Sequence, residues 1–403
     1  MALRELDFSE EKLNQWWKEV KDDFWGDLKR QTQGLVKQLL EGTLETDMVK
    51  YAGAGWHERT GKRKAYRNGY YTRDLLTEIG LIKDILVPRC RESGYRTRVF
   101  DRYERRQEKV NGTIREMFVA GVSTRRVGRV LGILLEGEVS AGTVSEIAKD
   151  LDKDVRSFHK RSLEDKYVYL FLDGVYLGVK GALRSKKRPV LVAYGITEDG
   201  HRELIDFRVA SSESEAQWYA FLNELYKRGL LGEKLKLIIT DGGGGLRSAL
   251  EVVYPYVERQ RCWAHKLRNV SNYLKKRDQK ECINQARSIY EASTRREAVA
   301  RFREWARKWS DVAPKAVKCL QKDLDELLSF LKFPEGHRKK IRTTNVIERC
   351  FREVRRRART MSCFNDVSSC NRIVYAVFAY MNEKWESPRA RLKGFESDSL
   401  KAA

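Results

Sequence analysis

Three acidic residues occupy positions from which carboxylates could act together on a phosphodiester. Asp173 lies in the run YVYLFLDGVYLGVK (residues 167–180), which we interpret as an apolar strand whose far end presents one carboxylate. Asp241 follows a second apolar run, KLKLIIT, in the same way, and Glu348 lies in the basic, helix-like segment RTTNVIERCFREVRRR. A lone aspartate at a strand end is most often a turn residue or a helix cap. The prediction therefore depends on the three acids together, in this order and on these element types.

Three carboxylates in a partly dry site repel one another unless cations lie between them. Hard oxygen ligands favour Mg²⁺ or Mn²⁺ over softer metals. Two such ions a few ångströms apart can activate a water or a 3′-hydroxyl and stabilise the leaving oxygen of a phosphoryl displacement. We therefore predict that Asp173, Asp241 and Glu348 are both the metal ligands and the catalytic residues of a site for two Mg²⁺ or Mn²⁺ ions.

The elements expected around the two aspartates form a mixed α/β domain. The strand with Asp173 precedes the strand-like runs RPVLVAYGIT and RELIDFRVA, the amphipathic helix SEAQWYAFLNELYKRGL and the apolar run before Asp241. The last run is typical of a buried parallel strand. Three strands, a helix and a fourth strand that ends in an acid are the order of a ribonuclease-H-like core. We predict that residues 163–266 form its first part.

About 107 residues separate Asp241 from Glu348, more than such a core needs. The interior of this interval is helical in pattern, so residues 267–336 are predicted to be an all-α insertion. Residues 337–385 then form the second part of the core, with the glutamate helix and a helix at 366–384 whose apolar face packs on the sheet. We expect residues 386–403 to be a flexible tail.

The part before residue 163 is predicted to bind DNA. A helical region at 1–60 contains a capped helix at 9–25 and a second helix at about 31–50. In region 61–162, Asn68-Gly69 indicates a hairpin turn, and helices are expected at about 104–120, 123–135 and 142–160. Short turns between short helices resemble a helix-turn-helix, whose DNA contacts would be made by Arg125, Arg126 and Arg129. A plain helical linker is the alternative.

Composition narrows the class of protein. The chain has 403 residues, 41% of them hydrophobic, so it is long enough for two or three globular domains. Its formal net charge of +23 would attract a polyanion, most commonly nucleic acid, although a basic surface alone is the simpler reading. No apolar run is long enough to span a membrane, and the N-terminus is unlike a signal peptide. Seven scattered cysteines without a CxxC pair fit reduced thiols in the cytoplasm.

Other residues near the acids have several possible roles. Cys262 and His265 have half the spacing of a zinc site, but no second pair follows, so a structural thiol and an imidazole that contacts the acids or a phosphate are preferred. The glycines at 242–245 lack a Walker pattern and indicate crowded backbone. We predict DNA contacts by basic residues of this segment and of the glutamate helix, with strongly salt-dependent binding: Lys266, Arg268, Arg352 and Arg356.

Six segments in order resemble the bacterial Mutator-like insertion-sequence transposases over about residues 45–385. They are RNGYYTRDLLTEIG with LVPR, GVSTRRVGRVL, LDGVYLGVK, TDGGGGL, RCWAHKLRNV and TTNVIER. The resemblance implies that the DDE acids are the three already named, in a ribonuclease-H-like core with a helical insertion. It further implies that Cys262 and His265 are the family's CxxH, and that Asn345 and Arg349 support the glutamate. Where the family commonly has histidine, this chain has Gly243.

The resemblance also implies a function. The chain would be a bacterial, nucleoid-associated cytoplasmic transposase that binds double-stranded DNA, namely the terminal inverted repeats of its element and the target, as a homodimer. Water would free a 3′-hydroxyl at the element end, and that hydroxyl would attack a target phosphodiester. Two other functions are compatible with the same residues. One is a ribonuclease-H-like nuclease without strand transfer, and the other is a DNA-binding regulator without catalysis.

Overall fold

The computed structural model describes residues 24–91, 94–101, 104–137, 139–180, 185–359 and 363–395. The first expected helix, at 9–25, thus lies almost wholly outside the described residues. The chain divides at Ala148 into two compact units. Within the described ranges no helix combines the length and the apolar character needed to cross a membrane.

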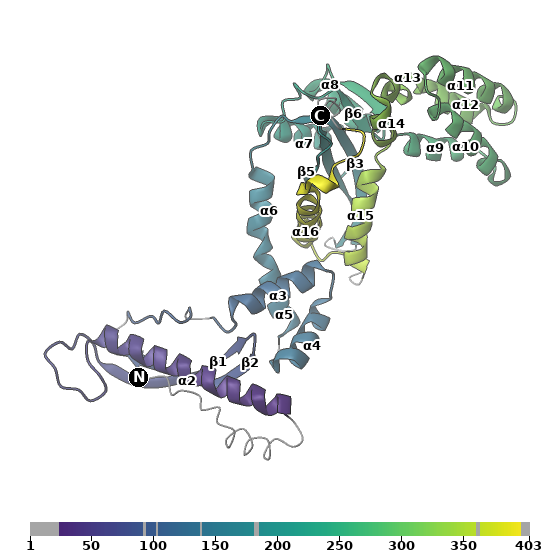
Figure 1. Cartoon of the computed structure of the whole chain (residues 1–403). Helices are drawn as coiled ribbons and strands as arrows, with labels where there is room; N and C mark the ends of the chain where they lie inside the picture. The colour runs from purple at the N-terminus through teal and green to yellow at the C-terminus, as the bar shows by residue number, and fades with distance from the viewer. Residues whose placement is uncertain are drawn as a thin grey trace, which may run out of the picture. The chain divides into compact units, whose positions relative to one another are not determined.

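The first unit is built on one long helix and a two-stranded hairpin. Helix α2 (Phe24–Ala52) is longer than the segment 31–50 predicted for it. It packs along strand β2 (Gly80–Cys90), which pairs antiparallel with β1 (Arg67–Thr77) (Figure 1). The small apolar core between them consists mainly of Leu44, Leu75, Ile82, Ile85, Val87 and Phe100.

The position of the hairpin turn differs from the prediction. Asn68-Gly69 does not form the turn but lies in an irregularity of β1, where the register shifts between Arg67 and Tyr70 and Gly69 has φ +72°. A glycine in the left-handed region is typical of a bulge as well as of a turn. The strands instead reverse between Thr77 and Gly80, where Gly80 has φ +117°.

Three helices follow in the first unit, close to the predicted positions. They are α3 (Glu108–Val119), α4 (Thr124–Leu135) and α5 (Ala141–Lys149). The cap predicted at Ser123 is present, since its side chain accepts a hydrogen bond from the Arg126 amide. The third predicted helix, 142–160, is two helices, because the chain breaks before α6 (Leu151–Lys160). Helix α6 belongs to the second unit, so the division falls nearer to 148 than to 162.

The second unit contains a five-stranded mixed sheet of order β5-β4-β3-β6-β7. Strands β3 (Tyr167–Lys180), β4 (Ser185–Thr197) and β5 (Arg202–Val209) form where strands were predicted, and the structure shows that they pair antiparallel in sequence. Strand β6 (Leu237–Thr240) pairs parallel with β3. Sequence reasoning missed β7 (Glu258–Arg261), which pairs parallel with β6 and whose polar sequence, ERQR, carries no strand pattern.

Helices cover both faces of this sheet. Helices α7 (Glu215–Lys227) and α8 (Gly244–Val253) pack on one face, where Leu170 and Leu172 of β3 enter the main core. On the other face, Phe171 contacts Tyr194, which contacts Trp385 of α16 (Val367–Glu386). Helix α15 (Asn345–Ala358) packs beside α16 and against β3 (Figure 1).

The described residues between β7 and α15 contain helices and no strand. In order they are α9 (Trp263–Ser271), α10 (Lys276–Tyr290), α11 (Arg295–Trp309), α12 (Pro314–Lys322), α13 (Leu324–Leu327), the 3-10 helix η1 (Ser329–Lys332) and α14 (Glu335–Ile341). After α16, residues expected in a flexible tail are instead packed. Phe395 is buried and stacks on His337, with 3.8 Å between ring centroids.

Candidate active site

Asp173 and Asp241 occupy matching positions on neighbouring strands. The parallel pairing of β3 and β6 ends at Leu172 opposite Thr240, so the residue that follows this last pair in each segment is one of the aspartates. Paired strands lie about 4.8 Å apart. Asp173 was predicted to lie at the end of its strand, but it does not, because β3 continues to Lys180 along β4. It marks the end of the parallel pairing, and this is what brings the two acids together.

The Asp173 side chain lies in the interior. It is 3% exposed, and its Oδ2 has no hydrogen-bond partner in the described part of the chain. Burial, reinforced by the nearby Asp241 and Glu348, raises the pKa of Asp173 to about 7, although His265 and a hydrogen bond with Thr344 act in the opposite direction. A buried carboxylate oxygen without a partner is costly. It is a hard oxygen ligand, of the kind that Mg²⁺ and Mn²⁺ prefer.

Glu348 enters this group from the first turn of α15. The helix buries Ile347, Phe351 and Val354 on one stripe, and Glu348 lies beside that stripe, half-buried. Its Oε1 lies 3.2 Å from the Arg268 guanidinium and 3.7 Å from His265 Nε2. Among the described residues, no group of three or more acidic, histidine or cysteine side chains is arranged so that it could hold a metal ion. The third acid is thus close to the aspartates but is engaged by two basic side chains.

His265 stands among the three acids and connects them to Cys262 and Thr344. Cys262 follows β7 directly, where its amide donates to the Thr240 carbonyl, and His265 lies in the first turn of α9. The buried Thr344 donates from its amide and hydroxyl to Cys262 Sγ, and its hydroxyl lies 3.4 Å from His265 Nδ1. Sequence reasoning missed Thr344, although it belongs to the segment TTNVIER.

The charges of this network are interdependent. The hydrogen bond with Cys262 and the charges of Asp173 and Asp241 outweigh burial and raise the pKa of His265 to about 9. Burial would raise the pKa of the Cys262 thiol, but the hydrogen bond and charge of His265 and the Thr344 hydroxyl lower it below its ordinary value. Without metal, His265 together with Arg268 therefore offsets part of the negative charge of the acids.

Different steric constraints apply to the glycines that follow Asp241. Gly242 has φ +83°, and a Cβ there would lie 2.5 Å from the Arg261 guanidinium carbon. A Cβ on Gly245 would lie 2.7 Å from the backbone amide nitrogen of Glu215, the first residue of α7. Gly243 donates its amide to Asp241 Oδ1 at 2.9 Å, and a Cβ there would only touch that carboxylate. Crowding thus explains the glycines at 242 and 245, whereas a Cβ at position 243 would make only ordinary contact with Asp241.

Lys266 is not available to DNA, contrary to the prediction. Its side chain is buried and forms an ion pair with Asp323, because the helical turn that points His265 at the acids points the next residue into the protein. Arg261 and Arg247 pair with the same aspartate, at 2.8 Å and 3.7 Å. We call these four residues the Asp323 network. It joins β7, α8 and α9 to the start of α13.

The other predicted basic residues lie on the surface. Arg268 is exposed and forms an ion pair with Glu348. Along α15 the exposed predicted residues are Asn345, Arg349, Arg352 and Arg356, and on α4 they are Arg125, Arg126 and Arg129. Arg357, also part of the basic run, is instead buried and pairs with Glu353 at 2.9 Å. The exposed set is where a phosphate backbone could be bound.

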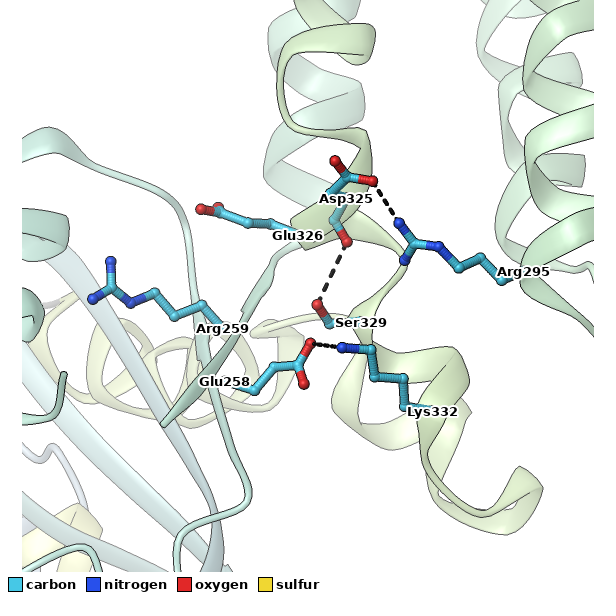
Figure 2. A pocket seen from close by; sticks show the side chains of 7 residues that line it. All are labelled: Glu258, Arg259, Arg295, Asp325, Glu326, Ser329 and Lys332. Carbon is cyan, nitrogen blue, oxygen red and sulfur yellow. Dashed lines mark hydrogen bonds and ion pairs between the residues drawn. The ribbon is translucent and has the colours of Figure 1, made fainter. Parts of the chain in front are cut away.

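A charged cleft of about 290 Å³ lies at the opposite end of β7 from Cys262. Figure 2 shows its lining, in which Arg295 pairs with Asp325 and Lys332 with Glu258. Glu258 pairs with Leu237, at the start of the parallel strands, whereas the acids follow the strand ends. The cleft is therefore separate from the candidate active site, and its charges are internally balanced.

Asp173 is expected to destabilise the metal-free protein at neutral and alkaline pH. Because its folded-state pKa is about 7, above about 3.9 for an unfolded aspartate, the folded chain retains a proton that the unfolded chain releases between these values. Stability therefore falls as pH rises through this window, by at most about 4 kcal/mol, at about 1.4 kcal/mol per pH unit. In chelator, Asp173→Asn should raise the Tm above that of the wild type at pH 8 and leave it nearly unchanged at pH 4.

Thermal unfolding followed by circular dichroism measures this difference. Asp311→Asn is the matched control, because Asp311 is exposed in the insertion and its replacement should not move the Tm at either pH. An Asp173→Asn protein no more stable than the wild type at pH 8 would show that the buried carboxylate carries no penalty.

Comparison with known proteins identifies the family. A family model described as "Transposase, Mutator family" matches residues 6–388. The chain is 34% identical to the transposase for insertion sequence element ISRM5 of Rhizobium meliloti, over 87% of each chain. It is 36% identical to the transposase for IS406 of Burkholderia multivorans, over 89% of this chain and 92% of the relative. It is 32% identical to the transposase for IS256 in transposon Tn4001 of Staphylococcus aureus, over 91% and 92%. The chain therefore belongs to the Mutator family of transposases.

Proposed function

We propose that the chain is a DDE transposase that, with Mg²⁺ or Mn²⁺ bound, cleaves DNA at the terminal inverted repeats of its insertion sequence and joins the ends to target DNA. The observation that carries this proposal is the pair of aspartates at matching positions of β3 and β6. One of them has a buried oxygen that lacks a partner in the described chain. Such a pair has its simplest physical explanation in a bound cation.

The architecture supports a ribonuclease-H-like assignment of the core. Three antiparallel strands, a helix and a parallel strand follow one another, and the sheet order places β3 at its centre. Helical segments alone separate β7 from α15 in the described residues, in agreement with an insertion before the glutamate helix. Both features are those that the family resemblance implies.

The residues of the site have separable roles in this proposal. Asp173 and Asp241 would hold the ions from paired strands, and Glu348 would complete the set after leaving Arg268 and His265. When bound, two divalent ions supply activation of the attacking water or 3′-hydroxyl and stabilisation of the leaving oxygen. Once Glu348 turns away, Arg268 and the protonated His265 lose a counter-ion, and a DNA phosphate would take its place. Thr344 would keep Asp173 and His265 in position.

Two basic surfaces would bind different parts of the DNA. Exposed arginines of α15 adjoin Glu348 and would bind the phosphates near the cleaved bond. The first unit, with Arg125, Arg126 and Arg129 exposed on α4, would recognise the terminal repeats. Two protomers would pair on two ends, since an insertion sequence has an inverted repeat at each terminus. We propose that the protein acts on DNA in the bacterial nucleoid.

The test is a cleavage and joining assay with the full chain, a labelled duplex that carries the element's own end, and a supercoiled target. We expect strand cleavage at the element end and joined products with Mg²⁺ or Mn²⁺, and neither in chelator. A duplex of the same composition with a scrambled end controls for nonspecific nicking. A footprint on the same duplex shows whether the repeat is bound.

The outcomes separate the proposal from its alternatives. Cleavage without joined products would favour a nuclease that does not transfer strands. Specific protection of the repeat without cleavage in either metal would favour a regulator that binds DNA only. Equal cleavage of the scrambled duplex would contradict recognition of the terminal repeats.

A further inference from the structure

A fourth carboxylate lies near Asp241 and next to Gly174, the residue that follows Asp173. Glu213 follows β5 and comes just before Ser214, the N-cap of α7, and it is half-buried. A Cβ built on Gly174, the residue after Asp173, would lie 1.9 Å from Glu213 Oε1 and 2.6 Å from its Cδ. The Glu213 carboxylate therefore occupies the space that a side chain at position 174 would fill. The carboxylate can approach β3 at this position because residue 174 is glycine.

The backbone of Glu213 is also held from the side of the second aspartate. A Cβ on Gly245, in the first turn of α8, would lie 2.8 Å from the Glu213 carbonyl oxygen and 2.7 Å from the Glu215 amide nitrogen. Gly245 belongs to the glycine run that follows Asp241, so this segment packs directly against the turn that positions Asp241. Gly174, directly after Asp173, thus leaves space for the Glu213 carboxylate, and Gly245, four residues after Asp241, leaves space for its backbone.

The charges around Glu213 are those of the candidate active site. Burial and then the Asp241 carboxylate raise the pKa of Glu213, whereas His265 and a hydrogen bond with Tyr176 act in the opposite direction. Glu213 therefore shares Asp241 and His265 as neighbours with Asp173. The buried Asp173 Oδ2, which has no partner among the described residues, independently indicates that a cation belongs at this place.

We propose that Glu213 is a fourth carboxylate of the metal site and binds or orients the divalent ion beside Asp241. This inference rests on the proposed function and deepens it. Charge favours it, because two divalent ions bring four positive charges beside His265 and Arg268, and a fourth carboxylate offsets more of this charge than three do. Structure alone would not require an acid here: Tyr176 is exposed, and a glutamine could accept its hydrogen bond.

Mn²⁺ titration calorimetry of the full chain tests this inference without measuring activity. Glu213→Gln should weaken Mn²⁺ binding by about tenfold or more, or remove one ion from the stoichiometry. Gly174→Ala should have the same effect while leaving every charge in place, because the new methyl group must displace the Glu213 carboxylate. That carboxylate is the far end of a flexible side chain, so Gly174→Ala should remain folded even if Glu213→Gln does not.

Three matched variants control for indirect effects. Glu215→Gln removes an exposed acid two residues away. Gly244→Ala adds a methyl group in the glycine run, where nothing lies within 4 Å. Tyr176→Phe removes the hydrogen bond to Glu213 and leaves its charge. All three should bind Mn²⁺ like the wild type, and melting curves in chelator confirm that each variant is folded.

The result also separates this inference from the proposed function. If Asp173→Asn abolishes Mn²⁺ binding while Glu213→Gln and Gly174→Ala bind like the wild type, Glu213 has no role toward the metal and the proposed function stands. If the wild type shows no Mn²⁺ binding that depends on Asp173, both fail. Loss of binding in Tyr176→Phe as large as in Glu213→Gln would assign Glu213 a structural role only.

Discussion

Asp173→Asn should slow cleavage of an element end by about a thousandfold or more, equivalent to about 4 kcal/mol of transition-state stabilisation. Asparagine keeps the size of the side chain but removes the charge that offsets a cation in a buried place, and Asp173 is the most enclosed of the three acids. Its neutral amide should also be better tolerated in the metal-free site. The variant should therefore be inactive although it is folded and, at pH 8, more stable than the wild type.

This combination distinguishes loss of the metal site from loss of the fold. Asp241→Asn and Glu348→Gln should be similarly inactive, and the double variant Asp173→Asn with Glu348→Gln no worse than either, because residues that act as one unit are not additive. Binding of the element end, measured by gel shift in chelator, should be retained or stronger, since negative charge is removed near the DNA. Asp311→Asn should cleave like the wild type. Cleavage by Asp173→Asn at the wild-type rate would reject the assigned role.

The two aspartates were predictable because a strand pattern and its break are local signals. The apolar run 237–240 has no polar position until Thr240, so the strand and the acid that follows it can be placed from the sequence. What could not be derived is that Asp173 lies inside a long strand. The pairing of β6 with β3 covers four residues and ends where β6 ends. Pairing between segments far apart in the chain produces no pattern in the sequence of either segment, so this end point could not be predicted.

Local signals failed where tertiary packing decided between two allowed outcomes. Asn68-Gly69 can form a turn or a bulge, and the reversal occurs ten residues later because Gly80 takes the positive φ there. Lys266 and Arg268 are two residues apart on one helix, so charge alone could not show that the first is buried and the second exposed. The partner that buries Lys266 is Asp323, 57 residues away.

The residues missed at the site share one property. Thr344 and Glu213 are positioned by neighbours that the fold supplies, namely Cys262 and His265 for the first and Gly174 with Asp241 for the second. Thr344 could have been found because it adjoins the segment of Glu348. Glu213 carries no such signal, since an acid before a helix is also a common way to favour a helix N-terminus.

Asp323→Ala is expected to lower the free energy of unfolding by about 3–5 kcal/mol, because it leaves the buried Lys266 ammonium without its counter-ion. Arg261 loses the same partner. Asp325→Ala is the matched control, since Asp325 lies two residues away, is exposed and pairs with Arg295 on the surface, where the loss should stay within about 1 kcal/mol. Urea unfolding measures both. Equal stability of the two variants would contradict the importance of the Asp323 network.

The acid limb of the stability curve gives a second readout. Burial raises the pKa of Asp323, but the hydrogen bond from Lys266 and the charge of Arg261 outweigh it and hold this pKa below its ordinary value. The stabilisation is therefore present above the unfolded pKa of about 3.9 and is lost as pH falls through the folded value. Wild type and Asp323→Ala should converge in stability as pH is lowered. Adding Lys266→Met to Asp323→Ala should cost less than the sum of the single changes, because it removes the charge left unpaired.

The Asp323 network also bears on the chemistry, because its members adjoin residues of the candidate active site in the sequence. Arg261 precedes Cys262, and Lys266 follows His265 in the first turns of α9. A shift of α9 after loss of Asp323 would move His265 away from Glu348 and the two aspartates. End cleavage by Asp323→Ala, measured well below its Tm, should therefore fall more than that of Asp325→Ala. Normal cleavage together with a lowered Tm would show that the network stabilises the fold without positioning the site.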